Sequence, residues 1–253
     1  MKNVAVRWED GAGEAAAGAA AAESSDEATT PLGQLAAPGR MIEVSGVGAA
    51  ARHTTAAALV RQAQLDGETT VWIQPQGGSL FPPDLADAGV DLQALVVVHV
   101  PRDRGEVGLA RAAELLLRSG AVGLVVIDLS EPPCPEDQVQ KDRSEGPRSS
   151  AAVAGGVSGA WRGPKLRAAR LRGEAWQARL AGLARLHSSR VVVLTRASGE
   201  QGTLGPLCGL RVEPRRERRG PGVFVVRPQV VKHKGGAPVR TGLTLRRGPW
   251  GLV

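Results

Sequence analysis

The sequence predicts an α/β protein with a mainly parallel, twisted sheet that is flanked by helices and completed by antiparallel hairpins. From Arg40 onward, strand-like and helix-like segments alternate, which is typical of parallel strands joined by right-handed crossovers. Aromatic residues make up only 3% of the 253 residues, and Tyr is absent. The core must therefore be built from Val, Leu, Ile and Ala, as in a sheet that is covered on both faces.

Each expected element follows from its local pattern. Short apolar runs predict the parallel strands, at residues 41–45, 69–73, 95–100, 124–128 and 191–195. Longer segments between most of these runs predict helices, at residues 55–65, 106–119 and 173–187. Short strand-like runs with turn residues between them predict the hairpins, at residues 210–212, 222–226, 229–232 and 241–245.

Two of these helices carry apolar side chains that we expect in the core. In the helix over 106–119, apolar residues recur at helical spacing, namely Val107, Ala110, Ala113, Leu116 and Leu117. Trp176 lies within the helix over 173–187 and is expected to pack inward instead of offering a stacking surface.

Two segments fall outside the alternating pattern. Residues 1–38 are expected to form a flexible Ala-rich tail, because residues 9–38 hold almost no large apolar side chain. Residues 39–253 are expected to form one domain. Within that domain, residues 131–163 are polar and Pro-rich and then consist mainly of small residues, which predicts a long mobile loop.

The composition narrows the class of protein. Cys134 and Cys208 lack the spacing of a metal site, and neither a metal nor another cofactor is expected. No run approaches the roughly 18 apolar residues of a membrane span. The first residues carry charges where a signal peptide would be apolar. We therefore expect a cytoplasmic protein, with association with the nucleoid as a further option.

The net charge of +7 is unevenly distributed along the chain. Acidic residues gather in residues 7–27, whereas Arg crowds the second half. This pattern has two interpretations of similar weight: Arg on solvated faces, or a surface for nucleic acid or an acidic partner. The candidate residues for contact with a partner or DNA are Arg167, Arg170, Arg172, Arg215, Arg216, Arg218, Arg219, Lys232 and Lys234.

The segment from Gly46 to Thr54 lies where a phosphate-binding loop would be, between a strand and a helix. A Walker A loop reads G-x-x-x-x-G-K-[ST], in which Lys reaches the phosphates and the hydroxyl holds Mg²⁺. Here Ala51, Arg52 and His53 occupy the last three positions. A count that starts at Gly48 places His53, Thr54 and Thr55 there, which restores a hydroxyl but neither the glycine nor the lysine.

The order of segments resembles the core of the RecA recombinase from about Gly39 onward. Gly39-Arg-Met-Ile-Glu-Val44 is similar to the family's G-R-I-V-E-I strand, and Ala88-Gly-Val-Asp-Leu-Gln-Ala-Leu95 to L-G-V-D-x-x-x-L. Arg118-Ser-Gly-Ala-Val-Gly-Leu-Val-Val-Ile-Asp128 resembles R-S-G-A-V-D-V-I-V-V-D, the Walker B strand. Val230-Val-Lys-His-Lys-Gly-Gly-Ala-Pro238 resembles V-V-K-N-K-x-x-A-P. The resemblance implies a RecA-like core.

The departures from the family suggest that catalysis is lost. Asp128 keeps the Walker B carboxylate, but His53 offers no hydroxyl to share a Mg²⁺ ion with it. The alternative is that Asp128 simply caps a helix or pairs with an Arg. The family's water-activating Glu falls near Gln76, and its γ-phosphate-sensing Gln is matched by Arg196. We therefore expect no ATP hydrolysis, although Arg52 could still bind an anion.

Two lysines and two loops matter for the partners that the resemblance implies. Lys232 and Lys234 match lysines that reach a neighbouring nucleotide in the recombinase filament, and they are either solvated or part of a surface that meets a RecA-type protomer. The family's two DNA-binding loops correspond to residues 131–161 and 197–208, which do not keep its sequence. Filament formation is not expected, because the Ala-rich tail replaces the family's N-terminal helix and strand and the family's C-terminal domain is missing.

A RecA-like core without its hydrolytic residues resembles the ImuA-type accessory proteins of damage-inducible mutagenesis. That similarity implies a role in SOS-induced translesion synthesis, with an ImuB-like Y-family protein and an error-prone C-family polymerase as partners, and with RecA as a further one. Three alternatives stay open: a DNA-binding mediator of recombination, a weak DNA-dependent ATPase, and, with less support, a cell-division inhibitor of the SulA type.

Overall fold

A computed structural model describes residues 31–48, 50–130, 164–197, 204–235, 241–242 and 244–247. Within this part of the chain, the strands form one eight-stranded sheet in the order β3-β2-β4-β5-β1-β6-β7-β8. The pairs from β3 to β6 are parallel, and β6-β7 and β7-β8 are antiparallel. The predicted fold class, a mainly parallel sheet with antiparallel hairpins after it, is thereby confirmed.

The five parallel strands expected from the sequence lie within two residues of their expected bounds. The strands are β1 Met41–Ser45, β2 Thr70–Pro75, β3 Leu95–Val100, β4 Leu124–Asp128, β5 Arg190–Thr195, β6 Leu210–Gly220, β7 Val223–His233 and β8 Thr244–Arg247. The helices are α2 Leu32–Leu35, α3 Arg52–Leu65, α4 Pro82–Asp87, α5 Gly105–Arg118 and α7 Pro164–Leu186, with 3₁₀ turns η1 Leu92–Ala94 and η2 Arg102–Arg104. α7 begins nine residues earlier than expected, and the short helices α2 and α4 were not expected. In the described part of the chain, no helix has the length and apolar character needed to cross a bilayer.

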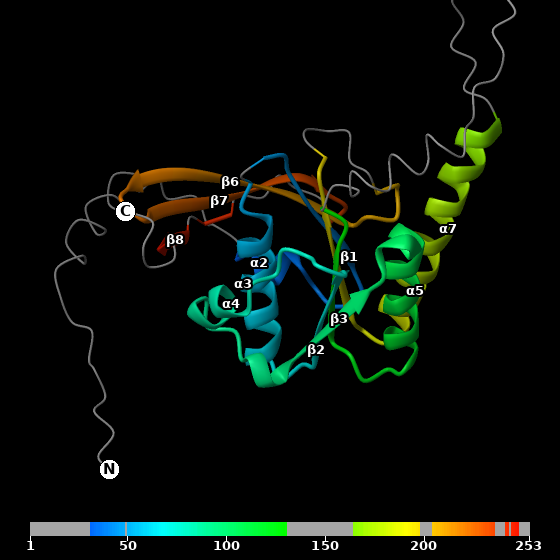
Figure 1. The fold of residues 1–253 in the computed structure, drawn as a ribbon, viewed down its shortest axis with the longest axis horizontal. Helices are drawn as coiled ribbons and strands as arrows, with labels where there is room; N and C mark the ends of the chain where they lie inside the picture. Colours follow the sequence, from blue (N-terminus) through cyan, green and yellow to red (C-terminus); the bar gives the residue numbers. More distant parts are fainter. Residues whose placement is uncertain are drawn as a thin grey trace, which may run out of the picture.

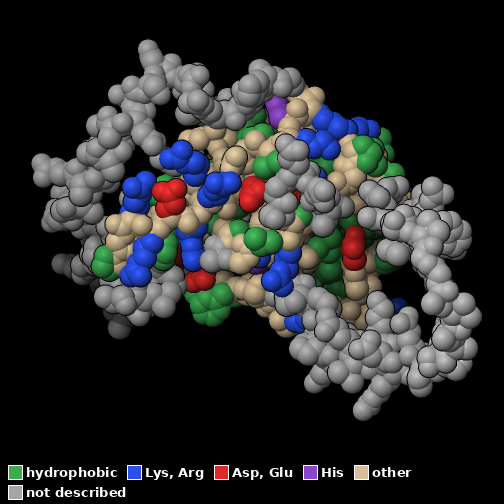
Figure 2. Space-filling view, turned by 90° about the horizontal axis from the view of Figure 1, so that it is seen from above, with side chains coloured by type: hydrophobic (Ala, Val, Ile, Leu, Met, Phe, Trp, Pro, Cys, Tyr) green, Lys and Arg blue, Asp and Glu red, His purple; other side chains and the backbone are tan. Residues whose placement is uncertain are grey.

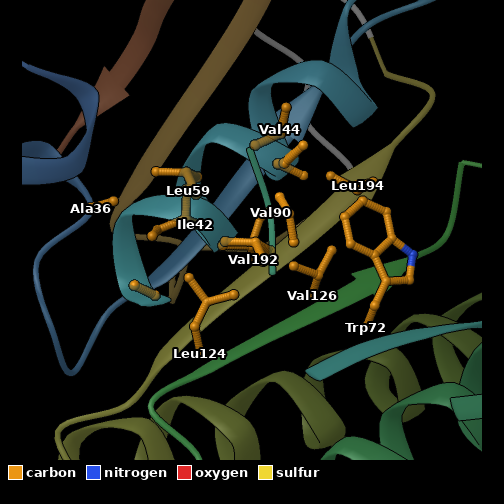
Figure 3. Close-up of a cluster of buried hydrophobic side chains, with 14 of the residues drawn as sticks. Ala36, Ile42, Val44, Leu59, Trp72, Val90, Leu124, Val126, Val192 and Leu194 are labelled. Carbon is orange, nitrogen blue, oxygen red and sulfur yellow. The ribbon is translucent and has the colours of Figure 1, made fainter. Parts of the chain in front are cut away.

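The sheet is covered by helices on both faces (Figure 1). On one face, α2, α3 and α4 pack over alternate strand residues, including Ile42, Val126 and Val192 (Figure 3). On the other face, α5 and α7 pack over the intervening ones, such as Val125 and Val191. Because each central strand is buried on both sides, it must be apolar at nearly every position, which explains the continuous apolar runs in the sequence.

The C-terminal ribbon differs from the sequence expectation. We predicted a strand of three residues at 210–212, whereas β6 continues to Gly220. The two strands predicted at 222–226 and 229–232 are one strand, β7, which runs through Pro228. Pro214 and Pro228 are partners in the β6-β7 register, so the two missing backbone donors fall on a single rung and the pairing continues past it.

Two further positions refine the sequence expectations. Val107, which we expected in the core face of α5, is 63% exposed, because it lies in the first turn of that helix. Leu35 and Ala36 lie before the domain boundary that we set at residue 38, and they pack in the cluster under α3. The loop predicted over residues 131–163 and residues 1–30 of the predicted tail lie outside the described residues.

Candidate functional site

The loop between β1 and α3 is held by backbone geometry and by Arg52. Gly46 has a φ of 154°, and a Cβ added there would lie 2.6 Å from the Cβ of Ala50, so glycine is required. The guanidinium of Arg52 donates from Nη1 to the carbonyl oxygen of Gly46. It therefore ties the first residue of the loop to the first residue of the helix. Ala49 lies outside the described residues.

His53, the next residue of α3, reaches the end of β4. Its Nε2 lies 2.9 Å from Oδ2 of Asp128, whose side chain is fully buried. Its ring is stacked on Trp72 of β2, with centroids 5.9 Å apart and an angle of 18° between the planes. Because an ionised carboxylate can only accept, Nε2 of His53 is the donor. The hydroxyl of Ser79 is also within 3.3 Å of the same Nε2.

The carboxylate of Asp128 is held in its ionised form by these contacts. Burial alone would raise the pKa of Asp128, but hydrogen bonds from His53 and from Ser130 outweigh it, so the pKa is lowered from its ordinary value. The backbone N–H of Ser130 donates to Oδ1 at 2.9 Å, and the Ser130 hydroxyl donates to the same oxygen at 2.5 Å. The carboxylate of Asp128 thus accepts from three donor atoms of the protein itself.

Arg52 is a buried cation in the same region. Only 8% of this residue is exposed, and within the part of the chain that the structure describes its Nε atom has no hydrogen-bond partner. Burial lowers the pKa of Arg52, the charge of Asp128 opposes this shift, and the nearby charge of Arg196 adds to it. The loop therefore already contains a guanidinium where a Walker A loop offers a lysine that is free to meet a phosphate.

The geometry favours the alignment of the Walker A motif that starts at Gly46 over the one that starts at Gly48. α3 begins at Arg52, and it is His53 that faces the Walker B carboxylate position. Thr55 is buried, and its hydroxyl donates to the carbonyl oxygen of Ala51 at 2.8 Å, within its own helix. Thr54 is half-buried.

The positions expected for a general base and a phosphate sensor are occupied by Gln76, which is not a carboxylate, and by Arg196, which is not a glutamine. Gln76 is exposed, and its carbonyl oxygen accepts from Nε of Arg102. Gln74 is buried, and its Oε1 accepts from the backbone N–H of Leu80. Arg196 follows β5 and is exposed. Among the described residues, no three His, Cys, Asp or Glu side chains gather into a metal-binding group.

A second buried polar network, which the sequence reading missed, joins β1, β5 and β6. Oε2 of Glu43 lies 2.8 Å from Nε of Arg211, and Oε1 accepts from the hydroxyl of Thr195 at 2.8 Å. The side chains of Glu43 and Arg211 are 0% and 5% exposed. The signal was available in part, since one Glu and one Arg interrupt two otherwise apolar strands, but only the strand order makes them neighbours.

The basic candidates on β6 lie on an exposed ribbon. Arg215, Arg216, Arg218 and Arg219 are all exposed, and Figure 2 shows Lys and Arg side chains gathered over the β6-β7 ribbon, with acidic side chains among them. The guanidinium carbon of Arg216 lies 4.6 Å from the ring centroid of Phe224 on β7. Arg219 contacts Glu217 at 3.3 Å, with both side chains 56% exposed.

The other candidates are spread over the molecule. Arg167, Arg170 and Arg172 belong to α7, but their side chains lie outside the described part. Lys232 is half-buried at the end of β7, and Nζ of the exposed Lys234 donates to the carbonyl oxygen of Pro206. The structure therefore brings together Gly46, Arg52, His53 and Asp128.

Trp176 is only 3% exposed, and its indole N–H donates to Oε1 of Glu106 at 3.0 Å. It packs in the core between α7 and α5, as the sequence predicted.

Comparison with known proteins adds a family. The family described as "RecA N-terminal domain" matches residues 18–163. Protein RecA of Clostridioides difficile is 33% identical over 107 residues, which are 42% of this chain and 30% of that protein. Protein RecA of Clostridium tetani is 31% identical over 107 residues, 42% of this chain and 29% of that protein. Protein RecA of Aquifex aeolicus is 32% identical over the same length, 30% of that protein. The match thus spans less than a third of these curated relatives.

Proposed function

We propose, because this chain belongs to the RecA family through a RecA N-terminal domain, that it is a non-catalytic accessory protein that works by binding other proteins. The proposed setting is SOS-induced translesion synthesis, as for the ImuA-type proteins that the sequence resembles. The proposed partners are an ImuB-like Y-family protein, an error-prone C-family polymerase and RecA itself, whose recombination activity the chain would modulate.

The observation that carries this proposal is the direct bond between His53 and Asp128. In a Walker site, the hydroxyl after the lysine and the Walker B Asp hold a Mg²⁺ ion between them. Here the imidazole of His53 contacts the carboxylate at 2.9 Å, a distance that leaves no room for an ion between the two groups. Arg52 is engaged with the Gly46 carbonyl, and Gln76 is not a base. A loop in which Arg52 is tied to the backbone and His53 fills the position next to Asp128 favours a role carried by surfaces.

Two measurements on the purified full chain test the proposal. Pull-downs against RecA and an ImuB-like protein should give stoichiometric complexes with at least one of them. A sensitive phosphate-release assay, with and without DNA, should give the same rate as a protein-free blank. Absence of binding to either protein would overturn the proposed role. A phosphate-release rate that Asp128→Asn abolishes would instead support the ATPase alternative.

A second candidate function is DNA binding, and the exposed arginines of the β6-β7 ribbon favour it. Four guanidiniums within five residues of β6 offer charge-assisted hydrogen bonds to phosphate oxygens. The proposed contacts are to phosphates, which carry no sequence information, so such binding would be independent of sequence. Gel-shift titrations against single- and double-stranded DNA of several sequences test this candidate, which requires similar affinity for all sequences of one length.

A further inference from the structure

The β6-β7 ribbon carries a surplus of positive charge that its own acidic residues do not balance. Residues 213–229 hold five arginines, four of them on β6 and Arg227 on β7, against the two acids Glu213 and Glu217, a net charge of +3. Arg215, Arg216, Arg218, Arg219 and Arg227 are all exposed. Arg246 and Arg247 of β8 are register partners of Phe224 and Val223, so further positive residues border the ribbon.

The opposite charge lies in the N-terminal segment of the same chain. Residues 9–27 contain six acids and no Lys or Arg, namely Glu9, Asp10, Glu14, Glu23, Asp26 and Glu27. The first basic residue after Arg7 is Arg40, at the start of the sheet domain. This acidic segment, which lies outside the described residues, therefore matches the ribbon in charge and exceeds the ribbon's surplus.

The described chain begins beside the base of the ribbon. α2 follows Pro31, and its Leu35 packs in the same apolar cluster as Leu210 and Val212 of β6. Leu32 of α2 and Val230 of β7 border this cluster as well. In Figure 1, α2 lies under the β6-β7 ribbon. The chain that leads back from Pro31 to the acidic segment therefore starts at the base of the ribbon, and Glu27 is only four residues away in sequence.

The lengths of the two segments are compatible. An extended chain spans at most about 3.6 Å per residue, so Glu27 lies within about 14 Å of Pro31 and Glu9 within about 80 Å. An 11-residue strand is about 37 Å long. Every part of the ribbon is therefore within reach of some of the acids.

We propose that residues 9–27 bind the β6-β7 ribbon of the same chain as an intramolecular acidic cover that competes with other polyanions. The tether keeps the segment at a high effective concentration, in the millimolar range for a short flexible link. Weak surface ion pairs, each worth little alone, then suffice to keep the ribbon occupied at low salt. The inference goes beyond the proposed function, because it concerns contact within one chain and holds whichever partner the protein serves.

A paramagnetic label placed in the segment tests the contact directly. A nitroxide is attached to Ser24→Cys in the full chain with Cys134→Ser; Cys208 does not compete, because it is fully buried. Amide signals of residues 214–227 should lose intensity at about 50 mM NaCl and recover at about 500 mM, where the Debye length falls from about 14 Å to about 4 Å. The reduced label gives the reference intensities.

Two sets of substitutions separate charge contact from chance proximity. The intensity loss should disappear when all six acids of residues 9–27 become Gln or Asn, and also in Arg215→Gln/Arg216→Gln/Arg218→Gln/Arg219→Gln. It should persist in a control that removes three charges from exposed arginines outside the ribbon, Arg61→Gln/Arg104→Gln/Arg185→Gln. The amide spectrum of each variant reports whether it is folded.

Three outcomes would overturn the proposal. The first is no intensity loss in residues 214–227 at low salt. The second is a loss that survives neutralisation of the ribbon. The third concerns a mixture of two proteins, one that carries the nitroxide but no ¹⁵N and one that carries ¹⁵N but no nitroxide. A loss of the same size in this mixture would mean that the segment binds a second copy.

Discussion

Nε2 of His53 lies 2.9 Å from Oδ2 of Asp128 and joins the first turn of α3 to the end of β4, across 75 residues of sequence. In a metal-dependent site of this fold, a divalent ion would make this connection. Here an imidazole makes it, and Ser130 supplies two further hydrogen bonds to the same carboxylate. The connection between helix and strand is thus kept without a metal.

Restoring the Walker residues should restore nucleotide binding. In Ala51→Gly/Arg52→Lys/His53→Thr, the lysine can reach a phosphate and the threonine can share Mg²⁺ with Asp128. We expect this variant to bind a fluorescent ATP analogue only when Mg²⁺ is present, and the wild-type chain to show no Mg²⁺-dependent binding. The triple variant should still release no phosphate, because Gln76 is not a carboxylate.

Adding Gln76→Glu to the triple variant places a carboxylate at this position, and the phosphate release of the two variants is then compared. Equal Mg²⁺-dependent binding by the wild-type chain and the triple variant would contradict the prediction.

Asp128→Asn should destabilise the fold by about 1.5–3 kcal/mol at neutral pH, because hydrogen bonds to a charged group are lost. The pKa of Asp128 is lower in the folded state than the ordinary value of about 3.9. The stabilisation is therefore fully present above the unfolded pKa and is lost as the pH falls through the folded pKa. Urea unfolding at several pH values should show the difference between wild type and variant shrinking in acid.

Asp87→Asn is a matched control, since Asp87 is exposed on α4. Its effect should stay within about 0.5 kcal/mol. A difference for Asp128→Asn that is constant from neutral to acidic pH would show that the charge of Asp128 is not what stabilises the fold.

Glu43→Ala should be more damaging, at about 3–5 kcal/mol, because it removes the carboxylate from a buried pair. Arg211 then loses its partner in a place that is 5% exposed, and the hydroxyl of Thr195 loses its acceptor. Replacing both members, in Glu43→Leu/Arg211→Met, should cost less than the sum of the single changes. Denaturant titrations provide the free energies of unfolding.

Glu217→Ala removes the same type of side chain from a pair that is 56% exposed on both sides. It should cost at most about 1 kcal/mol. If the two glutamate variants were equally destabilised, burial would not be the reason for the larger effect.

The sequence was sufficient for the parallel strands because each is buried on both faces. β1, β4 and β5 are buried at every position, and β4 and β5 therefore contain continuous apolar runs, whereas β1 is interrupted by Glu43. β6 could not be bounded in the same way, since its outer half is exposed and rich in Arg, a composition that equally suits a loop. Pairing with β7 sets its length, and pairing is a tertiary property.

For the candidate site, the sequence identified the residues but not their contacts. The lack of a hydroxyl at His53 followed from the motif alone, and the carboxylate of Asp128 from its strand. That His53 would bond to Asp128 and stack on Trp72 depends on the order of β1, β4 and β2 in the sheet. The Glu43–Arg211 pair was missed for the same reason, since its members are 168 residues apart.

The ribbon arginines should govern the salt dependence of any DNA binding. For single-stranded DNA, the logarithm of the association constant falls with the logarithm of salt by about 0.7 per phosphate contacted. The variant Arg215→Gln/Arg216→Gln/Arg218→Gln/Arg219→Gln should lower this slope by up to about 3, whereas Arg61→Gln/Arg104→Gln/Arg185→Gln should leave it nearly unchanged. Fluorescence anisotropy at several salt concentrations provides the slopes.

The acidic segment should weaken the binding of DNA to the ribbon at low salt. If residues 9–27 occupy the ribbon, replacing their six acids by Gln or Asn should tighten DNA binding at low salt, because the DNA no longer has to displace them. The gain should vanish near 0.5 M salt, where the Debye length is about 4 Å and the segment is already released. It should also vanish when the ribbon arginines are replaced in the same chain. An equal gain in that combined variant would mean that the acids repel DNA from the whole molecule, not that they cover the ribbon.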